Sequence, residues 1–132
     1  KSSLGAHGGS LKPGQWLCRG NYRFGLLGDG TLHLVNKNLR AGKCFFVWSA
    51  KKGGKLVNGD KLKMTKEGNL ALYSRAGETH WEAGCGTTRS NTKLKLFHAR
   101  KFVDANSIIV RTIQGKRQVW ALEKSGREDT RC

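Results

Sequence analysis

Three acidic residues recur in the sequence at nearly equal spacing, each inside the same kind of short segment. They are Asp29, Glu67 and Asp104, which lie 38 and 37 positions apart. Asn69 and Asn106 follow the second and third of them by two positions, so each pair would lie on one face of a β-strand. Acids and amides at this spacing are also common in turns. The repetition of the pair favours a hydrogen-bonding site, while the turn interpretation stays open.

No group of residues has the spacing of a catalytic or metal site. The histidines are scattered, and the sequence holds neither the His-Glu-x-x-His pattern of zinc enzymes nor the Gly-x-Ser-x-Gly pattern of serine hydrolases. A Cys-x-x-Cys pair is also missing. We predict that the protein is not an enzyme and that it holds no metal and no cofactor.

The elements that must position these side chains are short β-strands. Apolar residues show no helical spacing, and 18 glycines interrupt the chain too often for long helices. Residues 61–64 and 93–96 alternate strictly between lysine and an apolar residue, which places the lysines on one face of a strand. Turn-forming groups such as Gly28-Asp29-Gly30 separate the strands. The sequence therefore predicts an all-β protein.

A tryptophan closes each of the three repeated segments. Trp48, Trp81 and Trp120 lie 33 and 39 positions apart. This period predicts three equivalent sheets around a shared axis, with the tryptophans in the core. The three acids then fall on different sheets and cannot form an acid–base pair. We expect a single domain over residues 1–132, with repeats at roughly 10–50, 51–86 and 87–123 and a C-terminal tail at 124–132.

The repeated order of an Asp-Gly-Thr-Leu or Glu-Gly-Asn-Leu strand and a later tryptophan strand resembles the bulb-type, monocot mannose-binding lectin family. Residues 11–17 and 20–24 also look like that family's first strands, so the resemblance covers residues 10 to 123. It implies a β-prism II fold: three four-stranded antiparallel sheets with pseudo-threefold symmetry.

In that family, each sheet binds sugar through a strand with the pattern Gln-x-Asp-x-Asn-x-Val-x-Tyr. Every repeat of this chain departs from the pattern, and the glutamine is missing from all three. We expect repeats two and three to hold the remaining sugar binding, and His33 to replace a lost contact in the first. The residues to which the resemblance assigns carbohydrate binding are Asp104, Asn106, Val110, Glu67, Asn69, Tyr73, Asp29 and His33.

The chain is strongly basic, with 25 Lys and Arg against 9 Asp and Glu and a net charge of +16. A charge of this size on one small domain attracts polyanions. The lysine rows lack the interleaved aromatic residues that nucleic-acid binding would need. Nucleic acid is therefore disfavoured as a physiological partner, and sulfated glycans or an anionic surface fit better. The residues expected to bind anions are Lys51, Lys52, Lys55, Lys61, Lys63 and Lys66.

Four cysteines without a metal-binding spacing predict two disulfides in an oxidising compartment, and hence a secreted, extracellular protein. Four cysteines allow three pairings. In the three-sheet arrangement that the resemblance implies, Cys18 and Cys44 both fall in loops at one end of the first sheet, which favours a Cys18–Cys44 bond. A Cys85–Cys132 bond would then tie the C-terminal tail to the body.

These observations together predict a secreted, non-catalytic, lectin-like protein that binds mannose-type or anionic glycans through strand-borne sites and a basic surface. Its expected partners are glycans or glycoproteins, sulfated ones included. Two alternatives stay open: a polyanion binder without neutral-sugar specificity, and a cationic defence protein acting on microbial membranes or walls. An anionic membrane surface and a homodimer also stay open as partners.

Overall fold

The computed structural model describes residues 3–5, 9–38, 43–64, 69–83, 92–96, 108–114, 117–123 and 126–130. Every regular element within these ranges is a β-strand. None of the described residues forms a helix long and apolar enough to cross a membrane. The all-β class predicted from the sequence is confirmed.

The first sheet is formed by one stretch of chain, in the strand order β3-β4-β5-β6, with antiparallel neighbours. Leu17, Phe24, Leu34 and Trp48 lie opposite one another across its four strands. All four side chains belong to the core or pack against it, so the alternate residues of each strand lie on the outer face. The strands are β3 (Trp16–Arg19), β4 (Tyr22–Leu26), β5 (Leu32–Asn38) and β6 (Lys43–Ser49).

The second and third sheets each take an edge strand from the N-terminal segment. Their strand orders are β2-β9-β10-β11 and β1-β12-β13-β14-β15. The third sheet has one strand more than the four predicted, because tail residues 128–130 fold back antiparallel onto β14. The second sheet comprises β2 (Ser10–Leu11), β9 (Lys61–Met64), β10 (Leu70–Tyr73) and β11 (Thr79–Glu82). The third comprises β1 (Ser3–Gly5), β12 (Thr92–Leu96), β13 (Ile108–Gln114), β14 (Arg117–Glu123) and β15 (Glu128–Thr130).

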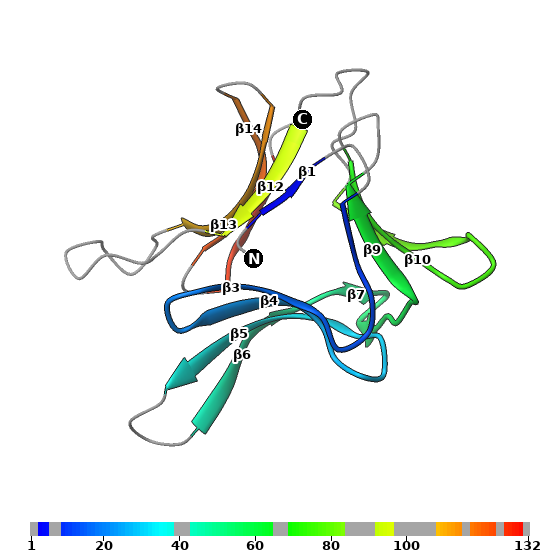
Figure 1. The fold of residues 1–132 in the computed structure, drawn as a ribbon, viewed down its shortest axis with the longest axis horizontal. Helices are drawn as coiled ribbons and strands as arrows, with labels where there is room; N and C mark the ends of the chain where they lie inside the picture. Colours follow the sequence, from blue (N-terminus) through cyan, green and yellow to red (C-terminus); the bar gives the residue numbers. More distant parts are fainter. Residues whose placement is uncertain are drawn as a thin grey trace.

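The three sheets form the sides of a triangular prism, as Figure 1 shows in a view down the short axis. Trp48, Trp81 and Trp120 each come from a different sheet and meet in the interior. Their ring centroids lie 5.6, 5.8 and 5.8 Å apart, with interplanar angles of 65° to 70°. Edge-to-face contacts of this kind stabilise a core by about 0.5–1.5 kcal/mol each beyond the area they bury. The tryptophans thus lie at the shared axis that the period of the repeat predicts.

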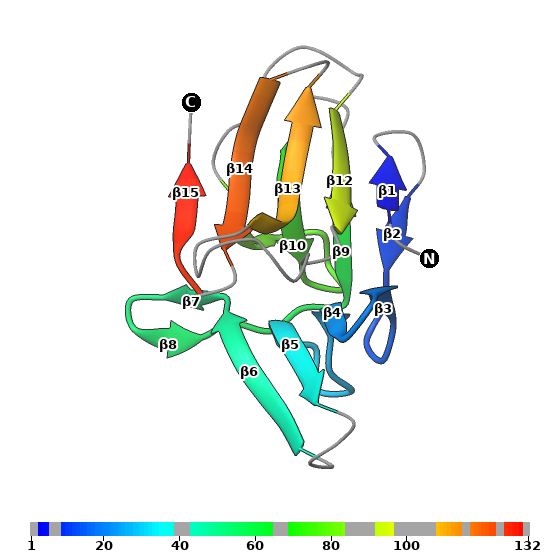
Figure 2. The same ribbon diagram turned by 90° about the vertical axis from the view of Figure 1, so that its left-hand side faces the viewer.

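A small hairpin outside the three sheets follows β6. It consists of β7 (Lys51–Lys52) and β8 (Lys55–Leu56) and projects from the body near the end of β6 (Figure 2). Gly53 and Gly54 have φ angles of 62° and 78°. Positive φ at both central residues is what a tight two-residue hairpin turn requires. The glycine pair in the sequence therefore sets the sharp tip of the hairpin.

The predicted disulfide between Cys18 and Cys44 is not formed. Cys18 is a free, exposed thiol on β3, whereas Cys44 belongs to β6 at the opposite edge of the same sheet. Neighbouring strands are about 4.8 Å apart, which separates these edges by about 14 Å. A disulfide needs Cα atoms within about 7 Å. Cys85 and Cys132, which form the second predicted pair, lie outside the described residues.

Candidate functional site

The outer face of the second sheet carries a polar row on β10. Leu70 and Leu72 are fully buried in the core. Asn69 and Tyr73 occupy the alternate positions, so they lie on the outer face, and both are half-buried. These are two of the residues to which the sequence assigns carbohydrate binding.

Lysines of β9 flank this row. The antiparallel register places Lys61 opposite Tyr73, and Lys63 opposite Ala71. Residues directly opposite each other in an antiparallel pair have their side chains on the same face, about 5 Å apart at Cβ. Two lysines predicted to bind anions thus lie on the same face as two residues predicted to bind sugar.

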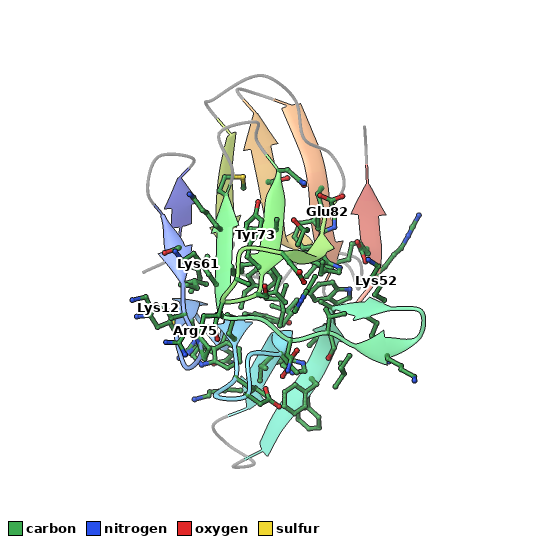
Figure 3. The ribbon with its side chains drawn as sticks, turned by 90° about the vertical axis from the view of Figure 1, so that its right-hand side faces the viewer. Lys12, Lys52, Lys61, Tyr73, Arg75 and Glu82 are labelled. Carbon is green, nitrogen blue, oxygen red and sulfur yellow. The ribbon has the colours of Figure 1, made fainter. Side chains whose placement is uncertain are left out.

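One end of this face is basic. Leu11 of β2 pairs with Leu62, so the next residue, Lys12, lies beside Lys61. Figure 3 shows Lys12, Lys61 and Arg75 gathered at this end of the sheet, with Tyr73 above them. Ammonium, guanidinium and phenol groups there can all donate hydrogen bonds to hydroxyl or anionic oxygens.

The other end of the face carries a carboxylate. Asn69 Nδ2 donates a hydrogen bond of 2.8 Å to Glu82 Oε2, which lies across the β10–β11 pair. Glu82 is exposed. A paired amide and carboxylate provide both donors and acceptors, which is the combination that hydroxyl-rich ligands need.

In the first sheet, the polar side chains at the corresponding positions hydrogen-bond to one another. Asp29 Oδ1 accepts hydrogen bonds from the backbone nitrogen of Thr31 at 3.0 Å and from Thr31 Oγ1 at 2.6 Å. Thr31 Oγ1 lies 2.7 Å from His33 Nε2, and His33 Nδ1 lies 2.6 Å from Ser49 Oγ. Four side chains therefore form one continuous chain of hydrogen bonds across β5 and β6.

The available hydrogens fix the direction of each hydrogen bond in this series. Thr31 donates its one hydroxyl hydrogen to the Asp29 carboxylate, so its oxygen can only accept from His33 Nε2. A neutral His33 therefore donates from Nε2 and accepts at Nδ1 from the Ser49 hydroxyl. Burial lowers the pKa of His33 below its ordinary value, although the Asp29 charge acts in the other direction. The hydrogen bonds from the Thr31 hydroxyl and backbone lower the pKa of Asp29. Both shifts favour a neutral imidazole beside an ionised carboxylate.

An aromatic ring covers the middle of this series of hydrogen bonds. Phe46 packs against the His33 ring with centroids 4.7 Å apart, and its own side chain is 57% exposed. Thr31 is only 8% exposed and His33 only 5%. Both nitrogens of His33 are therefore engaged within the protein, whereas Asp29 remains exposed at the end of the chain.

Known structures share this arrangement of sheets. No protein-family model matches the sequence, and no curated protein matches it. A monomeric monocot mannose-binding lectin from Gastrodia elata superposes with a TM-score of 0.69 at 28% identity, over 92% of this chain and 96% of that one. A Polygonatum cyrtonema lectin complexed with monomannoside gives 0.62 at 25% identity, over 86% and 90%. The mannose-specific agglutinin of snowdrop (Galanthus nivalis), complexed with methyl-α-D-mannoside, gives 0.64 at 23%, over 89% and 93%.

The chain has the fold of the bulb-type mannose-binding lectins. The resemblance drawn from the threefold repeat is thus confirmed by the solved structures.

The remaining predicted residues of this lectin-like chain fall in three places. Lys51, Lys52 and Lys55 are exposed on the β7–β8 hairpin, which does not belong to the sheet that holds the β9 lysines. Val110 lies on β13 between Leu96 and Leu122 of the neighbouring strands. The residues outside the described part are Glu67, Lys66, Asp104 and Asn106. Within the described part, no three His, Cys, Asp or Glu side chains come together as a metal site would require.

Sequence reasoning missed three residues of these two faces. Thr31 and Ser49 complete the hydrogen-bonded chain of the first sheet, and Glu82 partners Asn69 in the second. Ser49 and Glu82 each follow a core tryptophan by one position, so both are turned to the outer face. For Ser49 and Glu82, the position directly after a repeated tryptophan was therefore the available signal.

The buried imidazole predicts a pH-dependent stability. Because the pKa of His33 is lowered on folding from its ordinary value of 6.5, the unfolded chain binds a proton there first as pH falls. The free energy of unfolding should therefore decrease as pH drops below about 6.5, and this loss should level off below the folded pKa. Urea denaturation between pH 8 and pH 5 would measure it.

The matched variant is His33→Gln, which lacks the titrating group. Its unfolding free energy should depend less steeply on pH in this window than that of the wild type. An equal pH dependence in the two proteins would show that His33 does not titrate differently on folding.

Proposed function

We propose that the protein is a secreted, non-catalytic, lectin-like protein that binds glycans on the outer face of its second sheet. The supporting observations are the β9–β10 register, which brings Tyr73 onto one face with Lys61 and Lys63, and the Asn69–Glu82 hydrogen bond at the other end of that face. The ligand class that matches this set is a mannose-type or anionic glycan. Hydroxyls would bond to the amide, phenol and carboxylate, and any acidic group would lie toward the lysines.

The geometry favours a shallow site. Asn69 and Tyr73 are only half-buried, and Glu82 is exposed, so bound sugar stays in contact with water. Such sites bind weakly one at a time and gain strength when several engage a multivalent glycan. The expected ligands are therefore glycoproteins or polysaccharides with repeated terminal sugars.

The first sheet supports a different role. Its Thr31 and His33 are buried and already bonded to each other, so these groups are not offered to a ligand. Ser49, His33 and Asp29 are residue types that hydrolases use, but Thr31 separates the imidazole from the carboxylate. This row is better suited to holding β5 and β6 together than to catalysis.

Removing the polar groups of β10 should weaken glycan binding. A variant carrying Asn69→Ala and Tyr73→Phe loses one amide and one phenol, each of which contributes about 0.5–1.5 kcal/mol as a hydrogen-bond partner. We expect affinity to fall about tenfold or more for glycans selected on an array, measured by isothermal titration calorimetry. Asp29→Asn is the matched control, because it changes the equivalent row of the first sheet and should leave binding unchanged.

Two results would contradict the proposal. One is unchanged binding by the folded double variant. The other is a loss of every array signal when salt is raised, combined with equal binding of sulfated polymers by the wild type and the double variant at low salt, because attraction to a polyanion is screened by salt and needs neither the amide nor the phenol. The second result would identify a polyanion binder without sugar specificity.

A further inference from the structure

One segment of the chain combines positive charge with a lack of acidic residues. Between Asp29 and Asp60 the sequence contains no Asp or Glu. This acid-free segment, residues 30–59, spans β5, β6 and the β7–β8 hairpin. Its basic residues are Lys37, Arg40, Lys43, Lys51, Lys52 and Lys55. The segment therefore attracts anions and has no acidic residue of its own, and among the described residues the carboxylates bonded to it are Asp29, at Thr31, and Glu128, at Trp48.

The same segment also carries exposed apolar side chains. Among the described residues, the large hydrophobic side chains that are exposed are Phe45, Phe46 and Leu56, at 50%, 57% and 52%. All three lie within the acid-free segment. Single exposed apolar residues are ordinary, but a group of them beside lysines on adjoining elements indicates an interaction surface.

The two phenyl groups lie on opposite faces of an edge strand. Phe45 pairs with Asn36 and Phe46 with Val35, and β6 is the last strand of its sheet. The strand therefore presents one aromatic ring on each face of the sheet at this edge. Phe46 is also held in place, because it packs against the His33 ring.

The β7–β8 hairpin lies next to this edge and carries further exposed side chains. Lys51 pairs with Leu56, and Lys52 with Lys55, so one face of the hairpin is mixed and the other is purely basic. All four side chains are exposed. Val57 and Ala50 close the base of the hairpin with a backbone hydrogen bond of 3.3 Å. Figure 2 shows the hairpin projecting from the body close to β6.

We propose that the edge of β6 and the β7–β8 hairpin form a docking surface for a bilayer rich in anionic phospholipids. The lysines lie against the phosphate groups, and Phe45, Phe46 and Leu56 enter the interface between headgroups and acyl chains. Bases and sugar rings can stack on the two phenyl groups, but a polysaccharide or nucleic acid leaves the aliphatic Leu56 on the hairpin in water. The exposed apolar residues are therefore the reason to favour lipid. None of these elements belongs to the second sheet, which carries the proposed glycan-binding face.

Vesicle co-sedimentation tests this surface. The protein should bind vesicles of phosphatidylcholine mixed with phosphatidylglycerol, and should not bind vesicles of phosphatidylcholine alone. A basic-site variant with Lys51, Lys52 and Lys55 all changed to Gln should bind the anionic vesicles at least tenfold more weakly. An apolar-site variant, Phe45→Ser with Leu56→Ser, should lose a similar factor while keeping Phe46 and its contact with His33.

The controls separate charge from lipid insertion. Lys61→Gln with Lys63→Gln changes two lysines outside the surface and should leave vesicle binding within about twofold. Heparin should bind the apolar-site variant as it binds the wild type. Three results would overturn the proposal. The apolar-site variant could sediment with anionic vesicles like the wild type, which would indicate polyanion binding. Neutral vesicles could bind as well as anionic ones, or neither kind of vesicle could bind. Glycan binding should be unchanged in both surface variants, so the two proposals can fail separately.

Discussion

Replacing Trp120 with alanine is expected to lower the free energy of unfolding by about 3–5 kcal/mol. The side chain is fully buried and makes edge-to-face contacts with both Trp48 and Trp81. Its Nε1 also donates a hydrogen bond of 2.9 Å to an oxygen of Glu128, on the strand that the tail adds to the third sheet. The substitution therefore opens a cavity where the three sheets meet, and it removes a hydrogen bond that holds β15 against β14. Urea denaturation monitored by circular dichroism would measure the loss.

Trp16 supplies the matched control for this variant. It is only half-buried, on the edge strand β3, and it does not belong to the three-tryptophan cluster. Trp16→Ala should cost clearly less, about 1 kcal/mol. Equal losses at the two positions would contradict the central role assigned to Trp120.

Replacing Gly30 with alanine is expected to cost about 2–4 kcal/mol of unfolding free energy. Gly30 has a φ of 83°, in the left-handed region that residues with a Cβ rarely adopt. An added Cβ would also collide with the backbone oxygen of Gly59. The close approach of Gly30 and Gly59 holds two parts of the fold together. The Gly59 nitrogen donates a hydrogen bond of 3.0 Å to the Gly30 oxygen, which joins the first sheet to the segment leading into β9.

Gly28, two positions earlier, is the control. A Cβ added there would meet nothing within 4 Å, and its φ is not positive. Gly28→Ala should therefore change the unfolding free energy by less than about 0.5 kcal/mol. Thermal melting of the two variants, followed side by side, would contradict the argument if they unfolded at the same temperature.

The sequence predicted those parts of the fold that depend on periodicity. The spacing of the tryptophans was enough to place them together in the core, because equivalent positions in a repeat occupy equivalent positions around an axis. Alternation likewise placed Asn69 and Tyr73 on one face, because every second residue of a strand points the same way.

The wrong prediction and the missed residues depend on strand order and register, which local sequence patterns do not encode. Cys18 and Cys44 look close if loops alone are considered, but the strand order puts them on opposite edges of a sheet. Ser49 reaches His33 across 16 positions of sequence, and a bulge between Leu34 and Val35 shifts the pairing there. The lysines beside Tyr73 could be recognised as neighbours only once β9 was paired with β10.

The central claim is that glycan binds on the outer face of the second sheet and not on the first. An NMR titration of isotope-labelled protein, using a glycan that the array selects, tests this residue by residue. We expect the largest chemical-shift changes at Lys61, Lys63, Asn69, Tyr73 and Glu82, with little change at Thr31 and His33. Changes concentrated on the first-sheet row, with the second sheet unaffected, would contradict the account.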